Sequence, residues 1–223
     1  MALMSRSELL LVKMKLLSAT PSPYARKVRI ALIEKDIPFE LLTEVPWNAD
    51  ATTGRYNPLE KLPVLILPDG ETVYESRFIL EWLEVKHPVP ALFPKDPGEL
   101  LAARRLEVLA DGVCDAFLLA FWERRRPEAH RSEPWLERQL RKIHGGLREI
   151  ARLVPARGYC VGDKFSLGDI AVGTLLGYLN VRAPEVEWQR QYSHLETLLA
   201  RLSERPSFQA TVPYPQQHDA GVV

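Results

Sequence analysis

Residues 63–86 read PVLILPDGETVYESRFILEWLEVK, and this stretch decides the fold of the first part of the chain. Two short apolar runs, at 63–67 and 72–75, are separated by Pro-Asp-Gly at 68–70. Apolar runs joined across such a turn predict a β-hairpin. Apolar residues then recur at helical spacing along 76–86, which predicts a helix that closes the unit.

A strand, a helix and a second strand are predicted upstream of the hairpin. Apolar runs at 15–18 and 38–45 indicate the strands. The helix between them is indicated by residues at helical spacing: Tyr24, Val28, Ala31 and Leu32. We expect its polar residues to face outward, namely Arg26, Lys27, Arg29, Glu34 and Lys35.

The proline-rich stretch at 87–98 marks a domain boundary, because four prolines exclude a continuous helix there. Beyond it the spacing predicts only helices, at about 99–126, 134–154, 167–182 and 193–204. The predicted organisation is an N-terminal extension at 1–13, an α/β domain at 14–88, a linker at 89–98, an all-α domain at 99–213 and a tail at 214–223. The start of the natural chain is either Met1 or Met14.

Composition limits the function classes. The 223 residues carry 29 basic and 29 acidic side chains, so we expect neither nucleic acid nor an anionic membrane as the main partner. Cys114 and Cys160 stand far apart, form no C-x-x-C pair and have apolar neighbours. They therefore predict two buried thiols, with no metal or dithiol site, in a reducing compartment, the cytoplasm. No window is apolar and long enough for a membrane span.

Four motifs together resemble the bacterial soluble glutathione S-transferases, from Met14 to about Pro213. The motifs are SPYARKVRIALIEK at 22–35, NPLEKLPVLIL at 57–67, YESRFILEWLE at 74–84 and GDKFSLGDIAVG at 162–173. The resemblance implies a thioredoxin-like N-terminal domain and an all-helical C-terminal domain. It also implies glutathione as co-substrate, a small apolar electrophile, a role in detoxification and a homodimer.

Ser22 has two interpretations. Ser followed by Pro is a standard helix start, so Ser22 is a candidate N-cap. The resemblance places the thiol-contacting residue here, where the helix dipole and one hydroxyl would favour a thiolate. Lowering a thiol pKa from about 8.5 by about 2 units needs about 2.7 kcal/mol. A hydrogen bond to a charged acceptor supplies roughly 1.5–3 kcal/mol of that. Thr20 and Tyr24 remain alternative donors.

The resemblance also implies the residues that bind glutathione. It implies a cis Pro63, with the main chain of Leu62 pairing to the cysteinyl part of the tripeptide. Glu75 would pair with the ligand's ammonium group. Ser76, which is also the expected N-cap of its helix, would hold the γ-glutamyl carboxylate. Glu60 stands where many relatives carry glycine, and it adds a negative charge near an anionic ligand.

Other residues receive roles in the electrophile pocket or in folding. Aromatic side chains could line an apolar pocket at the domain junction, namely Tyr24, Phe117, Phe121 and Trp122. Ser166 and Asp169 fit a capping box that serves folding.

Two other functions fit the same fold: a glutathione-dependent reductase or deglutathionylase, and a non-catalytic glutathione-binding adaptor. Serine at position 22 disfavours the reductase, because it provides no thiol for a mixed disulfide.

Overall fold

The computed structural model describes residues 13–217. All of the predicted extension except Lys13, and the tail from residue 218, lie outside the described residues. The described chain forms two compact units, one of residues 13–90 and 213–217, the other of residues 91–212. The division after Pro90 falls within the predicted linker, and the start of the predicted tail belongs to the first unit.

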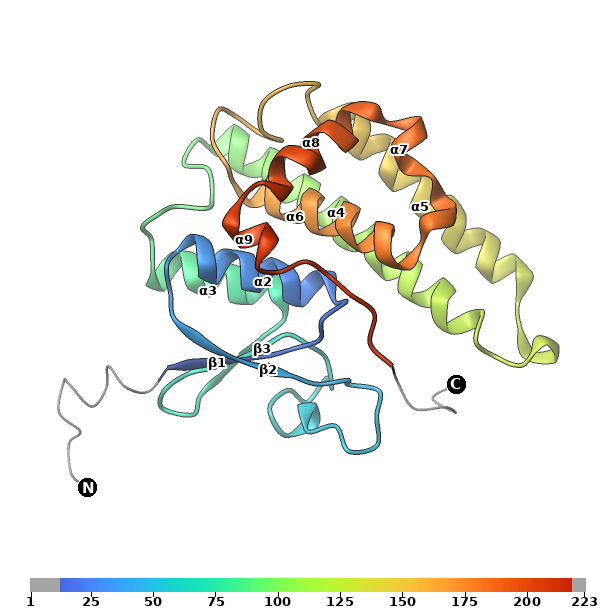
Figure 1. Ribbon diagram of the computed structural model, residues 1–223, viewed down its shortest axis with the longest axis horizontal. Coiled ribbons are helices and arrows are strands. Elements are labelled where there is room, and N and C mark those ends of the chain that lie inside the picture. Colours follow the sequence, from blue (N-terminus) through green and yellow to red (C-terminus); the bar gives the residue numbers. More distant parts are fainter. Residues whose placement is uncertain (1–12, 218–223) are drawn as a thin grey trace. The chain divides into compact units, whose positions relative to one another are not determined.

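The first unit has the predicted thioredoxin-like α/β architecture, with α2 and α3 on the same side of the sheet (Figure 1). Its elements are β1 (Met14–Ser18), α2 (Pro23–Glu34), β2 (Phe39–Thr43), the 3-10 turn η1 (Thr53–Arg55), β3 (Val64–Ile66), β4 (Thr72–Tyr74) and α3 (Ser76–Lys86). The strand order is β2-β1-β3-β4. β1 is parallel to β2 and antiparallel to β3, and β3 and β4 form the predicted hairpin.

Apolar side chains of the central strands form the core of this unit. Leu17 pairs with Val64 across β1 and β3, and both are buried together with Ala19 and Leu62. Because strand residues alternate between faces, neighbouring Leu16 and Leu65 are buried on the other side. The sheet is therefore covered on both faces, which fixes where β1 and β3 end and so where the loops that follow them lie.

The prediction that the polar residues of α2 face outward was wrong for its cations. Arg26, Lys27, Arg29 and Lys35 are all at most 8% exposed. For Lys35 the reason is clear, because its ammonium group donates to the carbonyl oxygens of His87 and Pro90, each at 2.7 Å. It also pairs with Glu84 at 2.8 Å. A sequence pattern of polar residues cannot distinguish a cation that faces solvent from a buried one that donates to main-chain oxygens of a distant segment.

The second unit consists of helices. They are α4 (Pro97–Glu123), η2 (Glu128–His130), α5 (Glu133–Leu153), α6 (Leu167–Arg182), η3 (Pro184–Val186), α7 (Trp188–Gln191), α8 (Ser193–Ser203) and α9 (Pro206–Gln209). The four long helices were predicted, whereas the short ones lie between or after the predicted helices.

Side chains cap the starts of α5 and α6, and the cap of α6 was predicted. The capping box of α6 is present, and the Asp169 carboxylate accepts from the backbone amides of Ser166 at 3.0 Å and Cys160 at 2.9 Å. Ser132 caps α5, since its hydroxyl accepts from the Trp135 amide at 3.4 Å.

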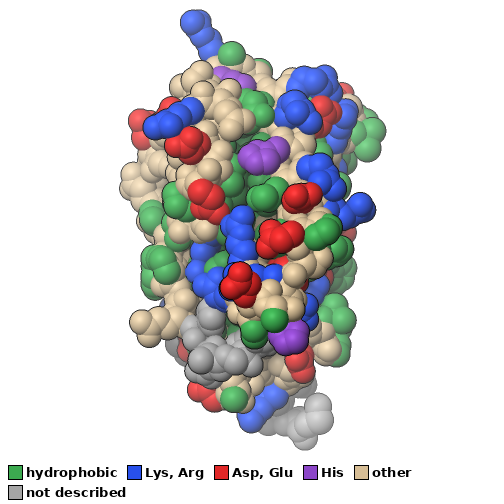
Figure 2. All heavy atoms as spheres, turned by 90° about the vertical axis from the view of Figure 1, so that its right-hand side faces the viewer, with side chains coloured by type: hydrophobic (Ala, Val, Ile, Leu, Met, Phe, Trp, Pro, Cys, Tyr) green, Lys and Arg blue, Asp and Glu red, His purple; other side chains and the backbone are tan. Residues whose placement is uncertain are grey.

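The distribution of surface charge and the burial of the two cysteines agree with the predictions from composition. Figure 2 shows basic and acidic side chains interspersed on one face rather than gathered into a single basic field. Cys114 and Cys160 are buried, as predicted, and they form no disulfide in the described part of the chain. Burial raises the pKa of the Cys160 thiol well above its ordinary value. Within residues 13–217, no helix is long and apolar enough to cross a membrane.

Candidate functional site

The loop between β1 and α2 places Ser22 at the positive end of a twelve-residue helix. Ser22 is the N-cap, and its hydroxyl oxygen accepts from the Ala25 amide at 3.2 Å. A serine hydroxyl has one hydrogen and two lone pairs, so this bond leaves the hydrogen for another acceptor. Among residues 13–217, no acceptor takes that hydrogen. The cap interpretation is confirmed, and it leaves Ser22 able to donate to a thiolate.

Thr20, an alternative donor, is engaged by the C-terminal segment 213–217. Its hydroxyl donates to the Tyr214 carbonyl oxygen at 3.1 Å, and its amide donates to the side-chain oxygen of Gln216 at 3.1 Å. The residue is 5% exposed. The single hydroxyl hydrogen of Thr20 is thus committed, which a sequence reading of the loop alone cannot reveal.

Helix α2 adds positive charge beside this loop. Its first turn contains no acidic residue, and Arg26 and Arg29 are both buried. Burial, followed by the positive charge of Arg29, lowers the pKa of Arg26 to about 10. Arg26 remains a cation at neutral pH. The local field, like the helix dipole, therefore favours an anion near the start of α2.

The loop before β3 presents the Leu62-Pro63 segment. The peptide bond between Leu62 and Pro63 is cis, as predicted. Buried Asn57 organises this loop, because its side chain donates to the Lys61 carbonyl at 2.8 Å and accepts from the Leu59 amide at 2.9 Å. Sequence reasoning missed Asn57, although Asn-Pro is a recognised turn signal.

Glu60 adopts a backbone φ of 53°. That left-handed conformation is one that glycine adopts more easily than residues with a Cβ atom. The carboxyl group of Glu60 lies over Gly54, where its Oε1 would be 3.6 Å from an added Cβ.

The start of α3 has two features that suit a zwitterionic ligand. Glu75 is the N-cap with a φ of 69°, so the prediction that Ser76 caps this helix was wrong by one residue. The Glu75 carboxylate is exposed and has no ion pair or hydrogen bond with the rest of residues 13–217. Ser76 is 1% exposed, and its hydroxyl is buried without a partner among the described residues. A helix N-terminus favours negative charge, so a buried hydroxyl at this place suits the binding of a carboxylate.

The aromatic residues predicted for an electrophile pocket differ in accessibility. Phe117 is 3% exposed and packs edge-on against Tyr178 at 5.3 Å, so it belongs to the core of the second unit. Phe121 and Trp122 are half-buried, with ring centroids 5.2 Å apart. Tyr24, on α2, is also half-buried. Phe117 therefore offers a ligand the least surface of the four.

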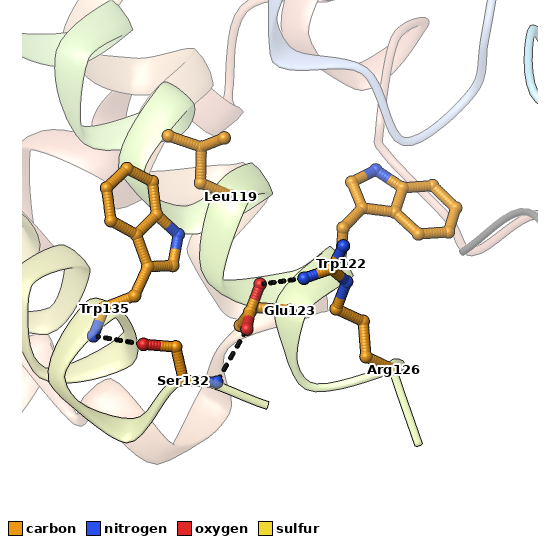
Figure 3. Close-up of a pocket in the computed structure, with 6 residues that line it drawn as sticks. All are labelled: Leu119, Trp122, Glu123, Arg126, Ser132 and Trp135. Atoms are coloured by element: carbon orange, nitrogen blue, oxygen red, sulfur yellow. Dashed lines mark hydrogen bonds and ion pairs between the residues drawn. The ribbon is translucent and has the colours of Figure 1, made fainter. Parts of the chain in front are cut away.

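Trp122 lines a cavity of about 440 Å³ between the end of α4 and the start of α5. Figure 3 shows Leu119 and Trp135 on one side of Glu123 and Trp122 on the other. Glu123 accepts from the Ser132 amide at 2.8 Å and pairs with Arg126 at 3.6 Å. The acid in this cavity is therefore used to hold the start of α5.

Metal chemistry has no assembled ligand set in the described part of the chain. Between Lys13 and Gln217, no three or more His, Cys, Asp or Glu side chains are grouped so that they could hold a metal ion.

Comparison with known proteins gives a consistent result. Residues 21–86 match the model for the glutathione S-transferase N-terminal domain, and residues 133–201 match that for the C-terminal domain. The chain is 40% identical over 200 residues to the uncharacterized GST-like protein YibF of Escherichia coli K12, covering 90% of this chain and 98% of YibF. It is 28% identical over 199 residues to maleylacetoacetate isomerase of Rattus norvegicus, covering 85% of this chain and 88% of the isomerase.

A solved structure extends this similarity to the fold. The crystal structure of a glutathione S-transferase from Methylobacterium radiotolerans, in complex with glutathione sulfonate, superposes with a TM-score of 0.93 at 62% identity. The alignment covers 95% of this chain and all of that chain. Two matched domains, close relatives and the observed architecture agree: the chain belongs to the glutathione S-transferase family.

Proposed function

We propose that the protein conjugates glutathione to a small electrophile that the helical unit presents. Glutathione binds the first unit through the main chain of Leu62, beside Pro63, and through Glu75 and Ser76. Ser22 stabilises the thiolate, and the bound sulfur attacks the electrophile. The helix dipole and the hydroxyl favour the reaction because they raise the fraction of bound glutathione that is ionised at neutral pH, and the thiolate is the nucleophile.

The observation that carries this proposal is the hydrogen-bond arrangement of the β1–α2 loop. Ser22 accepts a bond from Ala25 and keeps its hydrogen, whereas Thr20 gives its hydrogen to Tyr214. Ser22 is therefore the better placed donor of the two. The buried hydroxyl of Ser76 supports a carboxylate anchor at the second helix start.

The test is Ser22→Ala. Glutathione affinity should change by less than about threefold, while the pKa of the bound thiol, followed by thiolate absorbance, rises by about 1–2 units. Turnover of a chloronitrobenzene should then fall about 10–100-fold at neutral pH. The variant also loses a helix cap, which costs about 0.5–2 kcal/mol of stability.

Ser132→Ala is the matched control, because it removes the cap of α5 without touching the first unit. It should lose similar stability and keep both the thiol pKa and the turnover. Unchanged turnover in Ser22→Ala would show that Ser22 serves only the helix.

A glutathione-dependent isomerisation is the second candidate, because one relative is named maleylacetoacetate isomerase. The two reactions differ in mass balance: conjugation consumes one glutathione per product, whereas isomerisation returns it.

The reductase is disfavoured, since Cys114 and Cys160 are both buried and burial raises the pKa of Cys160. Glutathione binding in calorimetry without turnover of any electrophile would instead indicate the adaptor.

The proposed enzyme is a cytoplasmic homodimer that acts in detoxification. A groove of about 550 Å³ between α4 and α5, with Val108 at 56% and Leu119 at 45% exposure, offers an apolar surface for a second copy. Val108→Glu should convert the dimer to a monomer in sedimentation experiments. A wild-type monomer at micromolar concentration would contradict this assignment.

A further inference from the structure

Two arginine side chains flank one aromatic ring at the end of α4. The guanidinium carbon of Arg125 lies 3.5 Å from the centroid of the Phe121 ring, and that of Arg182 lies 5.2 Å from it. Arg182 comes from the last turn of α6. Each distance is within the range of a cation–π contact. Two like charges gathered around one ring nevertheless repel each other, so the cluster lacks a compensating anion.

Neighbouring arginines of the same segment do have acidic partners. Arg124 pairs with Glu185 at 3.1 Å, and Arg126 pairs with Glu123 at 3.6 Å. By contrast, neither Arg125 nor Arg182 is paired with a carboxylate in the described part of the chain. Burial and the positive charge of Arg182 lower the pKa of Arg125, as expected for neighbouring cations that no acid compensates.

The ring between them lies on other aromatic side chains. Phe121 contacts Trp122 edge-on at 5.2 Å and Phe117 at 6.2 Å, and Phe117 in turn meets Tyr178. The Arg125 guanidinium thus lies over the Phe121 ring, and the Arg182 guanidinium lies over the same ring at a longer distance. A guanidinium group binds a carboxylate through two parallel hydrogen bonds, and a flat conjugated body can stack on a guanidinium plane.

We propose that Arg125 and Arg182, positioned over Phe121, bind the carboxylate of a flat aromatic or conjugated acid, so that the electrophile is an organic anion. The link to catalysis rests on the proposed function, whereas the binding site itself does not. Binding is therefore measured first on the full chain without glutathione, and conjugation second.

The probe is para-chloro-meta-nitrobenzoate, a flat acid that is also an activated aryl chloride, with the matching benzamide as its neutral control. In calorimetry, Arg125→Gln and Arg182→Gln should each weaken benzoate binding about tenfold, as expected for one charge-assisted hydrogen bond. Benzamide binding should be weaker in the wild type and the same in both variants. Arg124→Gln, which removes an already paired cation, should change benzoate binding less than about twofold.

Three outcomes would overturn the proposal. The first is benzoate binding unchanged in both variants, and the second is an equal loss in Arg124→Gln, which would indicate only a diffuse positive field. The third is sulfate binding as tight as that of the benzoate, which would indicate a general anion site. Melting temperatures within a degree or so of the wild type establish that the variants are folded.

Conjugation then separates this proposal from the proposed function. With glutathione present, the Arg125 and Arg182 variants should lose about tenfold in kcat/KM for the benzoate and nothing for the benzamide. Ser22→Ala should lose activity equally with both. Wild-type activity on the benzamide with none on the benzoate would overturn the anionic electrophile and leave conjugation intact.

Discussion

Replacing Ser76 with alanine should move stability and glutathione affinity in opposite directions. Ser76 is 1% exposed, and its hydroxyl has no hydrogen-bond partner among the described residues. The buried hydroxyl therefore carries a desolvation cost of about 1–3 kcal/mol in the unliganded protein. Alanine removes that cost and is a better helix former by roughly 0.5 kcal/mol. Part of the gain is offset by the small void left behind. The unliganded variant should therefore be as stable as the wild type or more stable by about 1–2 kcal/mol.

Affinity should fall in the same variant. If the hydroxyl donates to a carboxylate of glutathione, its loss removes a hydrogen bond to a charged acceptor worth about 1.5–3 kcal/mol. Calorimetry should then show a dissociation constant about 10–150-fold higher, because each 1.4 kcal/mol is a factor of about ten. Thermal unfolding without glutathione should show a melting temperature that is unchanged or a few degrees higher, at about 2–4 °C per kcal/mol.

Ser166→Ala provides the contrasting control, since Ser166 is buried within a satisfied capping box. It should lose about 0.5–2 kcal/mol of stability and keep its glutathione affinity. If Ser76→Ala instead loses stability and binds glutathione normally, Ser76 is an ordinary structural residue and the inference from its unpartnered oxygen is wrong.

Two further changes test other parts of the first unit. Lys35→Met removes the cation that Glu84 and the carbonyl groups of His87 and Pro90 share. The free energy of unfolding, measured with denaturant, should fall by about 3–5 kcal/mol. A loss below about 1 kcal/mol would show that the buried cation is dispensable. Gln216→Ala removes the acceptor of the Thr20 amide, so hydrogen exchange at that amide should accelerate while the pKa of the bound thiol stays constant. A shift of that thiol pKa would mean that the C-terminal segment acts on the thiolate as well as on Thr20.

The sequence was sufficient for the elements whose signals are local. The hairpin at 63–75 follows from apolar runs around a Pro-Asp-Gly turn, and the four long helices from their 3.6-residue period. The short helices at 188–191 and 206–209 were missed, because a single turn contains too few residues to show a period. The order of elements in the first unit and the linker position followed from the sequence of element types and a cluster of prolines, whereas the thioredoxin-like fold was implied by the family resemblance.

Burial of charge could not be predicted in the same way. Arg26, Lys27, Arg29 and Lys35 lie at helix positions that pattern rules assign to solvent, yet they are buried. The partners of Lys35 are main-chain oxygens at positions 87 and 90, and carbonyl groups have no sequence signature. The same holds for the φ of Glu75, which depends on how β4 meets α3 and not on the residue type.

The choice between Ser22 and Thr20 shows why a site can be located from sequence while its chemistry stays open. Both hydroxyls belong to one short loop, and local rules give each of them one hydrogen to donate. The structure separates them through the C-terminal segment, whose Tyr214 and Gln216 engage Thr20 from almost two hundred residues away. Because that segment is part of the first unit, the state of the loop depends on both ends of the chain. Any change that releases Tyr214 returns a second hydroxyl hydrogen to the loop. A Ser22→Ala chain that ends before Tyr214 should therefore regain part of its activity, and adding Thr20→Val should abolish that gain.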